Sequence, residues 1–457
     1  MTAPDATSEI DGSTEVAPKA SWRESVAVYL QRRVLIVLFL GFSSGLPLAL
    51  SGSTLLVWMR EAGVDLGTIG LFALVGTPYT LKFLWAPLVD ALHVPFFTRI
   101  FGRRRGWLLF SQLLLIATIL LLAVADPARS PLFVALAALF VATASSTQDI
   151  VVDAFRVESL PESEQAAGMA SYVAAYRIGM LVSTAGALFI VSGFESSGLS
   201  KPAAWMWGYV VMAAFVLIGT ITALIATEPG QSARVESATH AEAAFSRVIH
   251  AAAGAFSEFL NRKDALAALA FVVLFKFTDA FSGSMTAPFV IDLGFSRNDY
   301  AAIVKGVGLA ATLIGGFAGG FLARRYSLPA SLWIGGVLQA VANLSFSWLA
   351  VVGINQWALA LAITAENFTS AIGTVIFVAY LSALCQNPLH TATQYALLTA
   401  LAAVGRTYLS SGAGYVAKAT GWPLFFVICV VVAVPGLMLL AYLQRRGHFD
   451  ALGPVRV

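Results

Sequence analysis

Apolar segments long enough to cross a lipid bilayer recur twelve times along this sequence. A membrane-spanning helix needs about 20 mostly apolar residues. Such segments are predicted at 34–58, 66–90, 107–125, 131–155, 167–192, 204–226, 265–290, 299–323, 329–351, 356–384, 394–418 and 422–443. With 58% hydrophobic residues, 12% charged residues and a mean hydropathy of +0.80, the chain has more apolar surface than a soluble fold can cover. The sequence therefore predicts an all-α polytopic membrane protein.

The predicted spans form two sets of six, which a polar stretch separates. We expect a tail over 1–33, a first six-helix bundle over 34–226, a linker over 227–264, a second six-helix bundle over 265–443 and a tail over 444–457. Because residues 1–31 are polar and the first apolar run is too long for a signal sequence, we expect no cleavable signal peptide. Twelve transmembrane helices in two bundles resemble the major facilitator fold.

Lysine and arginine are distributed unequally between the connections on the two sides of the membrane. If both termini share one side, that side receives 17 of these residues and the other side receives five. The five are Arg60, Arg129, Lys201, Arg297 and Lys418. Because cytoplasmic connections carry an excess of lysine and arginine, we expect both termini and the 227–264 linker in the cytoplasm.

Nine ionisable side chains lie inside the predicted apolar spans. They are Lys82, Asp149, Asp153, Arg177, Lys276, Asp279, Lys305, Glu366 and Arg406. An isolated charge at the bilayer centre costs roughly 2.5–3.5 kcal/mol, so nine unpaired charges would outweigh the net stability of a typical domain. We therefore expect most of them to be paired, to lie near a membrane interface or to face a polar cavity.

Depth along the spans suggests partners for some of these charges. Asp149 and Arg177 lie at similar distances from the same membrane face, given a rise of about 1.5 Å per residue. For this couple, a structural ion pair and a functional role both remain open. Lys276 and Asp279 are i, i+3 neighbours on one span, and for them we favour function.

Glu366 and Arg406 are also predicted at mid-membrane. Arg406 is either a structural partner or a functional cation. Glu366 has no opposite charge within one turn of its own helix, and we favour a functional role for it, with pairing to Arg406 as the alternative. The remaining charges are expected to extend toward a membrane interface: Lys82, Asp153 and Lys305.

No motif for catalysis, phosphate binding or metal binding stands out. Without a phosphate loop, a zinc-type H-E-x-x-H pattern, a Cys/His cluster or a nucleophile–base pattern, we expect no cofactor, no metal and no enzymatic activity. Cys385 and Cys429 fall in apolar helical stretches and are interpreted as packed small side chains. The net charge of +3 comes mainly from residues that set membrane topology, so no nucleic-acid partner is indicated.

Short motifs that carry a family resemblance occur in both halves. In the first half they are 44–50 (SGLPLAL), 82–90 (KFLWAPLVD), 102–109 (GRRRGWLL), 148–154 (QDIVVDA) and 176–181 (YRIGML). In the second half they are Lys276 with Asp279, Lys305, 366–367 (EN), 392–394 (ATQ) and 403–406 (AVGR). Together they resemble the AmpG-type muropeptide permeases, a bacterial branch of the major facilitator superfamily related to acetyl-CoA transporters. Two departures concern the cytoplasmic gate: Ala91 replaces the usual arginine, and the loop gains residues 92–101.

The resemblance implies proton-driven import of anhydromuropeptides, that is GlcNAc-1,6-anhydro-MurNAc and its peptides, across the inner membrane from periplasm to cytoplasm. It also implies a role in peptidoglycan recycling and, in some bacteria, in β-lactamase induction. The residues it suggests for substrate binding are Lys276, Arg406, Arg177, Tyr79, Gln148 and Tyr176. Those suggested for proton coupling are Glu366, Asp149 and Asp279. Those suggested for a gate are Asp90, Arg103, Arg104 and Arg105.

Other functions remain open at this point. A carrier of the same fold for a different solute, such as acetyl-CoA or a peptide, would show the same spans and buried charges. A membrane enzyme or receptor is a more remote alternative, because no sizeable soluble domain lies between the spans. In every case the membrane lipid and a small-molecule ligand are the expected partners.

Overall fold

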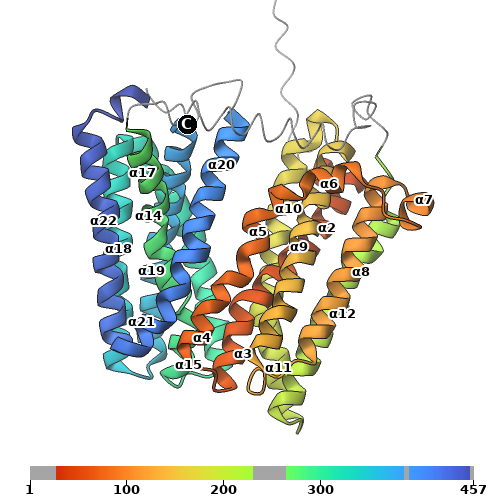
Figure 1. Ribbon diagram of the computed structural model, residues 1–457, viewed down its shortest axis with the longest axis horizontal. Helices are drawn as coiled ribbons and strands as arrows, with labels where there is room; N and C mark the ends of the chain where they lie inside the picture. Colours follow the sequence, from red (N-terminus) through yellow and green to blue (C-terminus); the bar gives the residue numbers. More distant parts are fainter. Residues whose placement is uncertain (1–26, 230–263, 385–390, 453–457) are drawn as a thin grey trace, which may run out of the picture.

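The computed structural model describes residues 27–229, 264–384 and 391–452, and the regular secondary structure within these ranges is helical (Figure 1). Ten helical segments are long and apolar enough to cross a membrane. The other two predicted spans, 66–90 and 394–418, consist of successive short helices. The predicted all-α membrane fold is confirmed, although two of its spans are broken rather than continuous.

The first group of helices contains spans one to six. Its helices are α2 (Arg32–Ala49), α3 (Leu55–Glu61), α4 (Leu66–Leu71), α5 (Thr77–Leu81), α6 (Ala86–Ala91), α7 (Phe97–Phe101), α8 (Arg103–Ala123), α9 (Pro131–Ser159), α10 (Glu162–Leu181), α11 (Ala187–Ser196) and α12 (Lys201–Ile225). Helix α2 packs against α9, α10 and α12, and α8 packs against α9 and α12. These contacts join all the long helices of the group around α2.

The second group contains spans seven to twelve. Its helices are α14 (Ala265–Gly283), α15 (Thr286–Asp292), α16 (Arg297–Asp299), α17 (Gly308–Arg325), α18 (Leu328–Val352), α19 (Gln356–Leu384), α20 (Thr391–Val404), α21 (Ala413–Thr420) and α22 (Trp422–Arg445). Helix α19 packs against α17 and α18, and α22 packs against α14 and α18. Several helices extend a few residues beyond the predicted spans. Hydropathy detects only the apolar part of a helix, whereas polar residues at its ends are helical too.

Irregular turns interrupt the spans that border the other group. Span 2 restarts at α5 and α6, each with a proline in its first turn, where the missing N–H is tolerated although the preceding helix cannot continue through it. Spans 1, 5, 8 and 11 each contain a π-helical turn: η2 (Leu50–Thr54), η5 (Val182–Gly186), η7 (Tyr300–Val307) and η8 (Gly405–Leu409). π-Helical turns are rare in proteins overall, and those that do occur are often found at functional sites.

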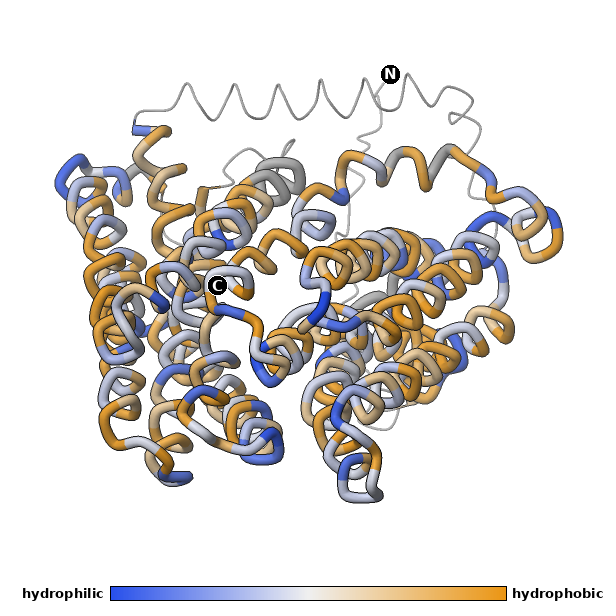
Figure 2. Tube along the Cα trace, turned by 60° about the horizontal axis from the view of Figure 1, so that its bottom comes forward, coloured by the Kyte–Doolittle hydropathy of each residue, from blue (hydrophilic) through white to orange (hydrophobic). Residues whose placement is uncertain are grey.

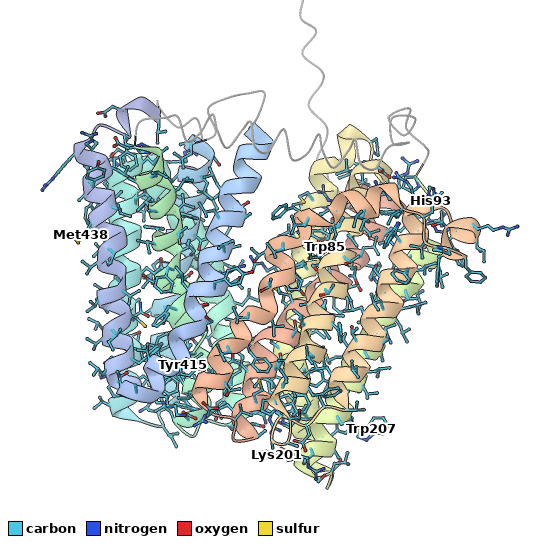
Figure 3. The ribbon with its side chains drawn as sticks, viewed as in Figure 1. Trp85, His93, Lys201, Trp207, Tyr415 and Met438 are labelled. Atoms are coloured by element: carbon cyan, nitrogen blue, oxygen red, sulfur yellow. The ribbon has the colours of Figure 1, made fainter. Side chains whose placement is uncertain are left out.

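Apolar side chains cover the outside of both groups. Trp207 on α12 and Met438 on α22 project from the two flanks of the molecule (Figure 3) and are 46% and 66% exposed. The hydropathy colouring shows apolar residues along the outer helices (Figure 2). Lipid chains require no polar face, so this surface suits a bilayer.

The two groups meet at one end and diverge toward the other (Figure 1). We call the end where α12 stops at Ile225 and α14 begins at Ala265 the linker face, and the opposite end the closed face. At the closed face α4 packs against α21, α3 against α15, and α11 against α16. The groups are therefore joined at the closed face.

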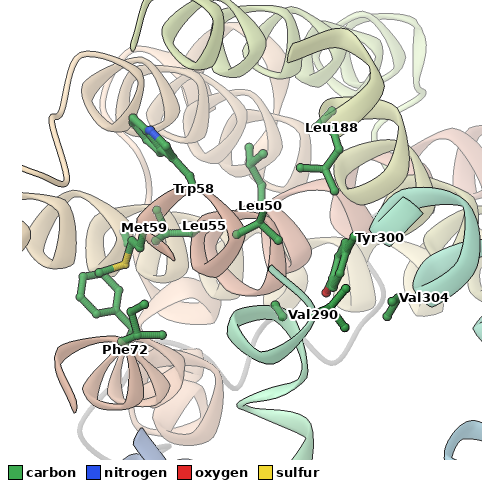
Figure 4. Packing of buried hydrophobic residues seen from close by; sticks show 14 of the residues in the cluster. Leu50, Leu55, Trp58, Met59, Phe72, Leu188, Val290, Tyr300 and Val304 are labelled. Carbon is green, nitrogen blue, oxygen red and sulfur yellow. The ribbon is translucent and has the colours of Figure 1, made fainter. Parts of the chain in front are cut away.

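Close backbone contact and apolar packing both contribute to this junction. A Cβ atom at Gly414 would lie 1.8 Å from the carbonyl oxygen of Leu66, and one at Gly70 would lie 2.8 Å from the Gly414 nitrogen. Only glycine permits α4 and α21 to approach so closely. Leu50 from the first group and Tyr300 from the second belong to the same buried cluster beside it (Figure 4).

Candidate functional site

A cavity of about 560 Å³ lies between the two groups, directly behind the contacts of the closed face. Helices of both groups contribute to its wall, and most of the side chains that line it are apolar or small. Its ionisable side chains are Arg177 on α10, Lys305 on η7 and Glu366 on α19, accompanied by the phenols of Tyr79 and Tyr300. The volume lies in the range of ordinary small-molecule sites.

The cavity brings together three of the residues predicted for binding and coupling: Tyr79, Arg177 and Glu366. The others are not among the described residues that line it: Lys276, Arg406, Gln148, Tyr176, Asp149 and Asp279. The expectation that Lys305 extends toward a membrane interface is wrong, because this side chain lines the cavity. Its ammonium nitrogen lies 5.3 Å from the ring centroid of Tyr300, a cation–π contact.

Glu366 has a neutral partner. The Nδ2 atom of Asn367 donates a hydrogen bond of 2.9 Å to its Oε2 atom. The alternative of an ion pair between Glu366 and Arg406 is not observed, and no described carboxylate lies within ion-pair distance of Arg406. Glu366 is thus a cavity carboxyl that no cation in the described part of the chain neutralises by direct contact.

Lys276 and Asp279 form the predicted i, i+3 ion pair, with Nζ 2.6 Å from Oδ2. Lys276 also donates to Thr374 Oγ1 at 3.0 Å, and Ser370 Oγ donates to Asp279 Oδ1 at 2.8 Å. Both hydroxyls are on α19, so the pair links α14 to α19 within the second group. This arrangement satisfies both charges and supports a structural role for the pair.

Asp149 pairs with a different cation from the one expected. Its Oδ2 atom lies 4.0 Å from Lys82 Nζ, and the predicted contact with Arg177 is absent. The carboxylate is buried, and its Oδ1 atom has no hydrogen-bond partner among the described residues. Beside it Gln148 donates to Ser44 Oγ at 3.3 Å, which fastens α9 to α2.

Charged side chains join the two groups at the rim of the closed face. We call Arg60, Glu61, Glu195, Asp292 and Arg297 the rim cluster. Arg297 Nε donates to Glu61 Oε1 at 3.0 Å, and its Nη1 donates to Glu195 Oε2 at 2.7 Å; its Nη2 also pairs with Glu61. Arg60 pairs with Asp292. Each of these ion pairs connects the first group to the second.

Two tryptophans and one further ion pair support the rim cluster. Trp205 Nε1 donates to Glu61 at 3.1 Å, and Trp422 Nε1 donates to Asp292 at 3.1 Å. Lys418 Nζ lies 3.4 Å from Asp65 Oδ1. Asp65 is in the connection between spans 1 and 2, and the hydrogen bond from Thr68 lowers the pKa of its carboxyl, so it keeps its charge toward Lys418.

The arginines of the predicted gate lie at the linker face and bond within the first group. Arg104 Nε donates to Glu158 Oε2 at 2.9 Å, and Arg105 Nη2 donates to the carbonyl oxygen of Leu224 at 2.6 Å. Arg103 Nη2 lies 3.4 Å from Glu158 Oε1. The side chain of Asp90 lies outside the described residues, so its part in a gate stays a prediction.

Within the described ranges, no group of three or more His, Cys, Asp or Glu side chains is placed to hold a metal ion. Cys429 is a buried free thiol, as expected for a packed small side chain, whereas Cys385 lies outside the described residues.

The rim cluster was not predicted from the sequence. Its members lie at the ends of spans 1, 5, 7 and 8, and two of them, Arg60 and Arg297, entered the prediction only as lysine and arginine counts. The sequence feature that could have indicated the cluster is the presence of Glu61, Glu195 and Asp292 near the same membrane face. Pairing opposite charges at equal depth across the two halves would have revealed it.

Comparisons with known proteins agree with this architecture. Residues 37–408 match the Major Facilitator Superfamily. The chain is 40% identical over 414 residues to the anhydromuropeptide permease of Escherichia coli K12, covering 90% of this chain and 80% of that protein. It is 34% identical to the putative transporter AmpG 4 of Rickettsia felis, covering 92% and 98%. The crystal structure of a D-xylose–proton symporter superposes with a TM-score of 0.64 at 14% identity, covering 90% and 97%.

Proposed function

Because the chain belongs to the major facilitator superfamily and, within it, to the AmpG-type permeases, we propose that it imports anhydromuropeptides into the cytoplasm by proton symport. One observation of the structure carries the proposal. A cavity with charged walls lies at membrane depth between two helical groups whose described residues join them at the closed face. A carrier that exposes its site alternately to the two sides requires this arrangement. The related permeases supply the class of substrate.

The proposed orientation places the linker face in the cytoplasm and the closed face in the periplasm, across the inner membrane. The basic residues of the linker face, such as Arg103, Arg325 and Arg445, support it. In this orientation the conformation described above faces inward. Cysteines placed near Gly63 and Ser296 should react with an impermeant thiol reagent in intact cells, and one near Ala323 should not. The reverse pattern would overturn the orientation.

Glu366 is the residue we propose for proton coupling. It lines the cavity, and its hydrogen-bond partner is a neutral amide, so it can gain a proton without leaving a buried cation unpaired. Asp279 is bonded to a lysine and a serine hydroxyl, and Asp149 faces Lys82 outside the cavity lining. Proton loading from the periplasm and release to the cytoplasm would then accompany each import cycle.

Transport by purified protein in proteoliposomes tests the proposal directly. Radiolabelled anhydromuropeptide should accumulate above its external concentration when a proton gradient is imposed inward, and should only equilibrate without one. Acetyl-CoA and a free peptide serve as competitors for the alternative substrates. Uptake of either competitor without uptake of the anhydromuropeptide would overturn the proposed substrate while leaving the carrier intact.

A further inference from the structure

Two cations line the cavity from opposite groups, and neither has an ion-pair or hydrogen-bond partner among the described residues. Arg177 comes from α10 in the first group and Lys305 from η7 in the second. Through their side chains, neither forms an ion pair or a hydrogen bond with a described residue. A charge inside a membrane span is normally paired or exposed to water. Two unpaired cations in the wall of one cavity therefore point to an anion that arrives from outside the protein.

The surroundings of Lys305 hold it in place without using its donors. Its ammonium group faces the ring of Tyr300 at 5.3 Å, and Tyr300 is only 2% exposed, fixed in the apolar cluster of the closed face. A cation–π contact leaves the three N–H groups of the ammonium free. Glu366 lies in the same wall but receives its hydrogen bond from Asn367 and forms no ion pair with Lys305.

Arg177 supplies a complementary group on the other side. Arg177 is an exposed residue of the cavity wall, and its guanidinium has five donors in a planar fork that suits a carboxylate. With Arg177 and Lys305 each positive and Glu366 negative, the described part of the lining carries one positive charge in excess even when Glu366 is ionised. Such a cavity favours anions over neutral or cationic solutes.

We propose that Arg177 and Lys305 form a two-point carboxylate site, with one point on each group, that can bind two carboxylates of a peptide-bearing anhydromuropeptide at once. The assignment rests on the proposed function and deepens it, because anhydromuropeptides with an attached peptide carry several carboxylates. A ligand bound at both points joins the two groups across the cavity. Ligand binding and the approach of the groups at the linker face are thereby linked.

Binding to the purified full chain tests the assignment. The probes are an anhydromuropeptide with free peptide carboxylates and the same compound with those carboxylates converted to amides. For the native compound, Lys305→Gln and Arg177→Gln should each raise Kd by about tenfold or more, the loss expected for one charge-assisted hydrogen bond. Lys305→Arg should retain most of the affinity. Lys201→Gln, at the exposed start of α12, is the matched control and should leave Kd unchanged.

The amide compound separates charge recognition from structural damage. Wild type should bind it at least tenfold more weakly than the native compound, and the two glutamine variants should bind it about as well as wild type does. Equal loss for both compounds in Lys305→Gln would overturn the assignment. So would equal affinity of wild type for both compounds, a measurement that requires no variant to fold. Failure of wild type to bind either compound would overturn the proposed substrate as well.

Discussion

Replacing Arg297 by methionine should open the closed face. The change keeps an unbranched side chain over Trp205, whose ring centroid lies 5.2 Å from the guanidinium carbon, but removes the three hydrogen bonds to Glu61 and Glu195. Arg297 and Glu61 side chains are 7% and 10% exposed. Removing one partner of such a buried pair costs about 3–5 kcal/mol.

The contact between Arg297 and Glu195 adds little to this cost of about 3–5 kcal/mol. The Glu195 side chain is 30% exposed, and pairs of this kind contribute up to about 1 kcal/mol. Trp205 still donates to Glu61, which favours the lower end of the range. When the groups separate at this face, water solvates Arg297, Glu61 and Glu195. The substitution therefore destabilises the closed arrangement and not the open one. A loss of about 3 kcal/mol changes the ratio of closed to open arrangements roughly 100-fold.

Thiol labelling measures this shift. Ser284→Cys places a thiol in the cavity wall, and both native cysteines are first replaced by serine. An impermeant reagent added on the side of the closed face should modify Ser284→Cys much faster in Arg297→Met than in its parent. Arg129→Met, at an arginine whose side chain is 88% exposed, is the control and should label like the parent.

Equal labelling rates in Arg297→Met and in its parent would refute the role assigned to the rim cluster. A second measurement checks the pairing itself. Glu61→Gln combined with Arg297→Met should be less damaging than the sum of the two single changes, because neither then leaves a buried charge alone. Strict additivity would show that the two side chains do not act together.

Three further changes test other parts of the molecule. Glu366→Gln should abolish accumulation of substrate against its gradient while leaving protein level and exchange intact; accumulation with unchanged pH dependence would remove Glu366 from coupling. Asp149→Asn and Lys82→Gln should each lower yield or uptake, and the double variant should recover part of the loss; purely additive losses would show that their 4.0 Å separation has no energetic consequence. Gly414→Ala should prevent closure, because its Cβ would lie 1.8 Å from the backbone of Leu66; normal thiol labelling and uptake would contradict this.

Much of the fold was predictable, since the length and apolar character of a span are properties of local sequence. The all-α class and the approximate positions of the ten long apolar helices follow from hydropathy alone. The i, i+3 pair of Lys276 with Asp279 was also predictable, because both residues are on one helix and their separation fixes their distance.

Pairing between spans was not predictable in the same way. Depth along a helix predicts that Asp149 and Arg177 lie at one level. It does not predict the rotation of each helix about its axis. Lys82 begins a short 3₁₀ segment (η4, Lys82–Leu84), where three residues complete a turn instead of 3.6, so its direction departs from that of a regular helix. Lys305 likewise lies in a π-helical turn, which directs it into the cavity rather than toward an interface.

Salt in the surroundings acts unequally on the charges of the closed face. In the proposed orientation these residues are in the compartment nearest the external medium. The screening length is about 10 Å at 0.1 M salt and about 3 Å at 1 M, so Lys418 and Asp65, which are 61% and 48% exposed, lose most of their attraction in a saline medium. Arg297 and Glu61 are shielded from those ions by burial. A change from a dilute to a saline medium would therefore weaken the contact between Lys418 and Asp65 first and leave the contact between Arg297 and Glu61 almost unchanged.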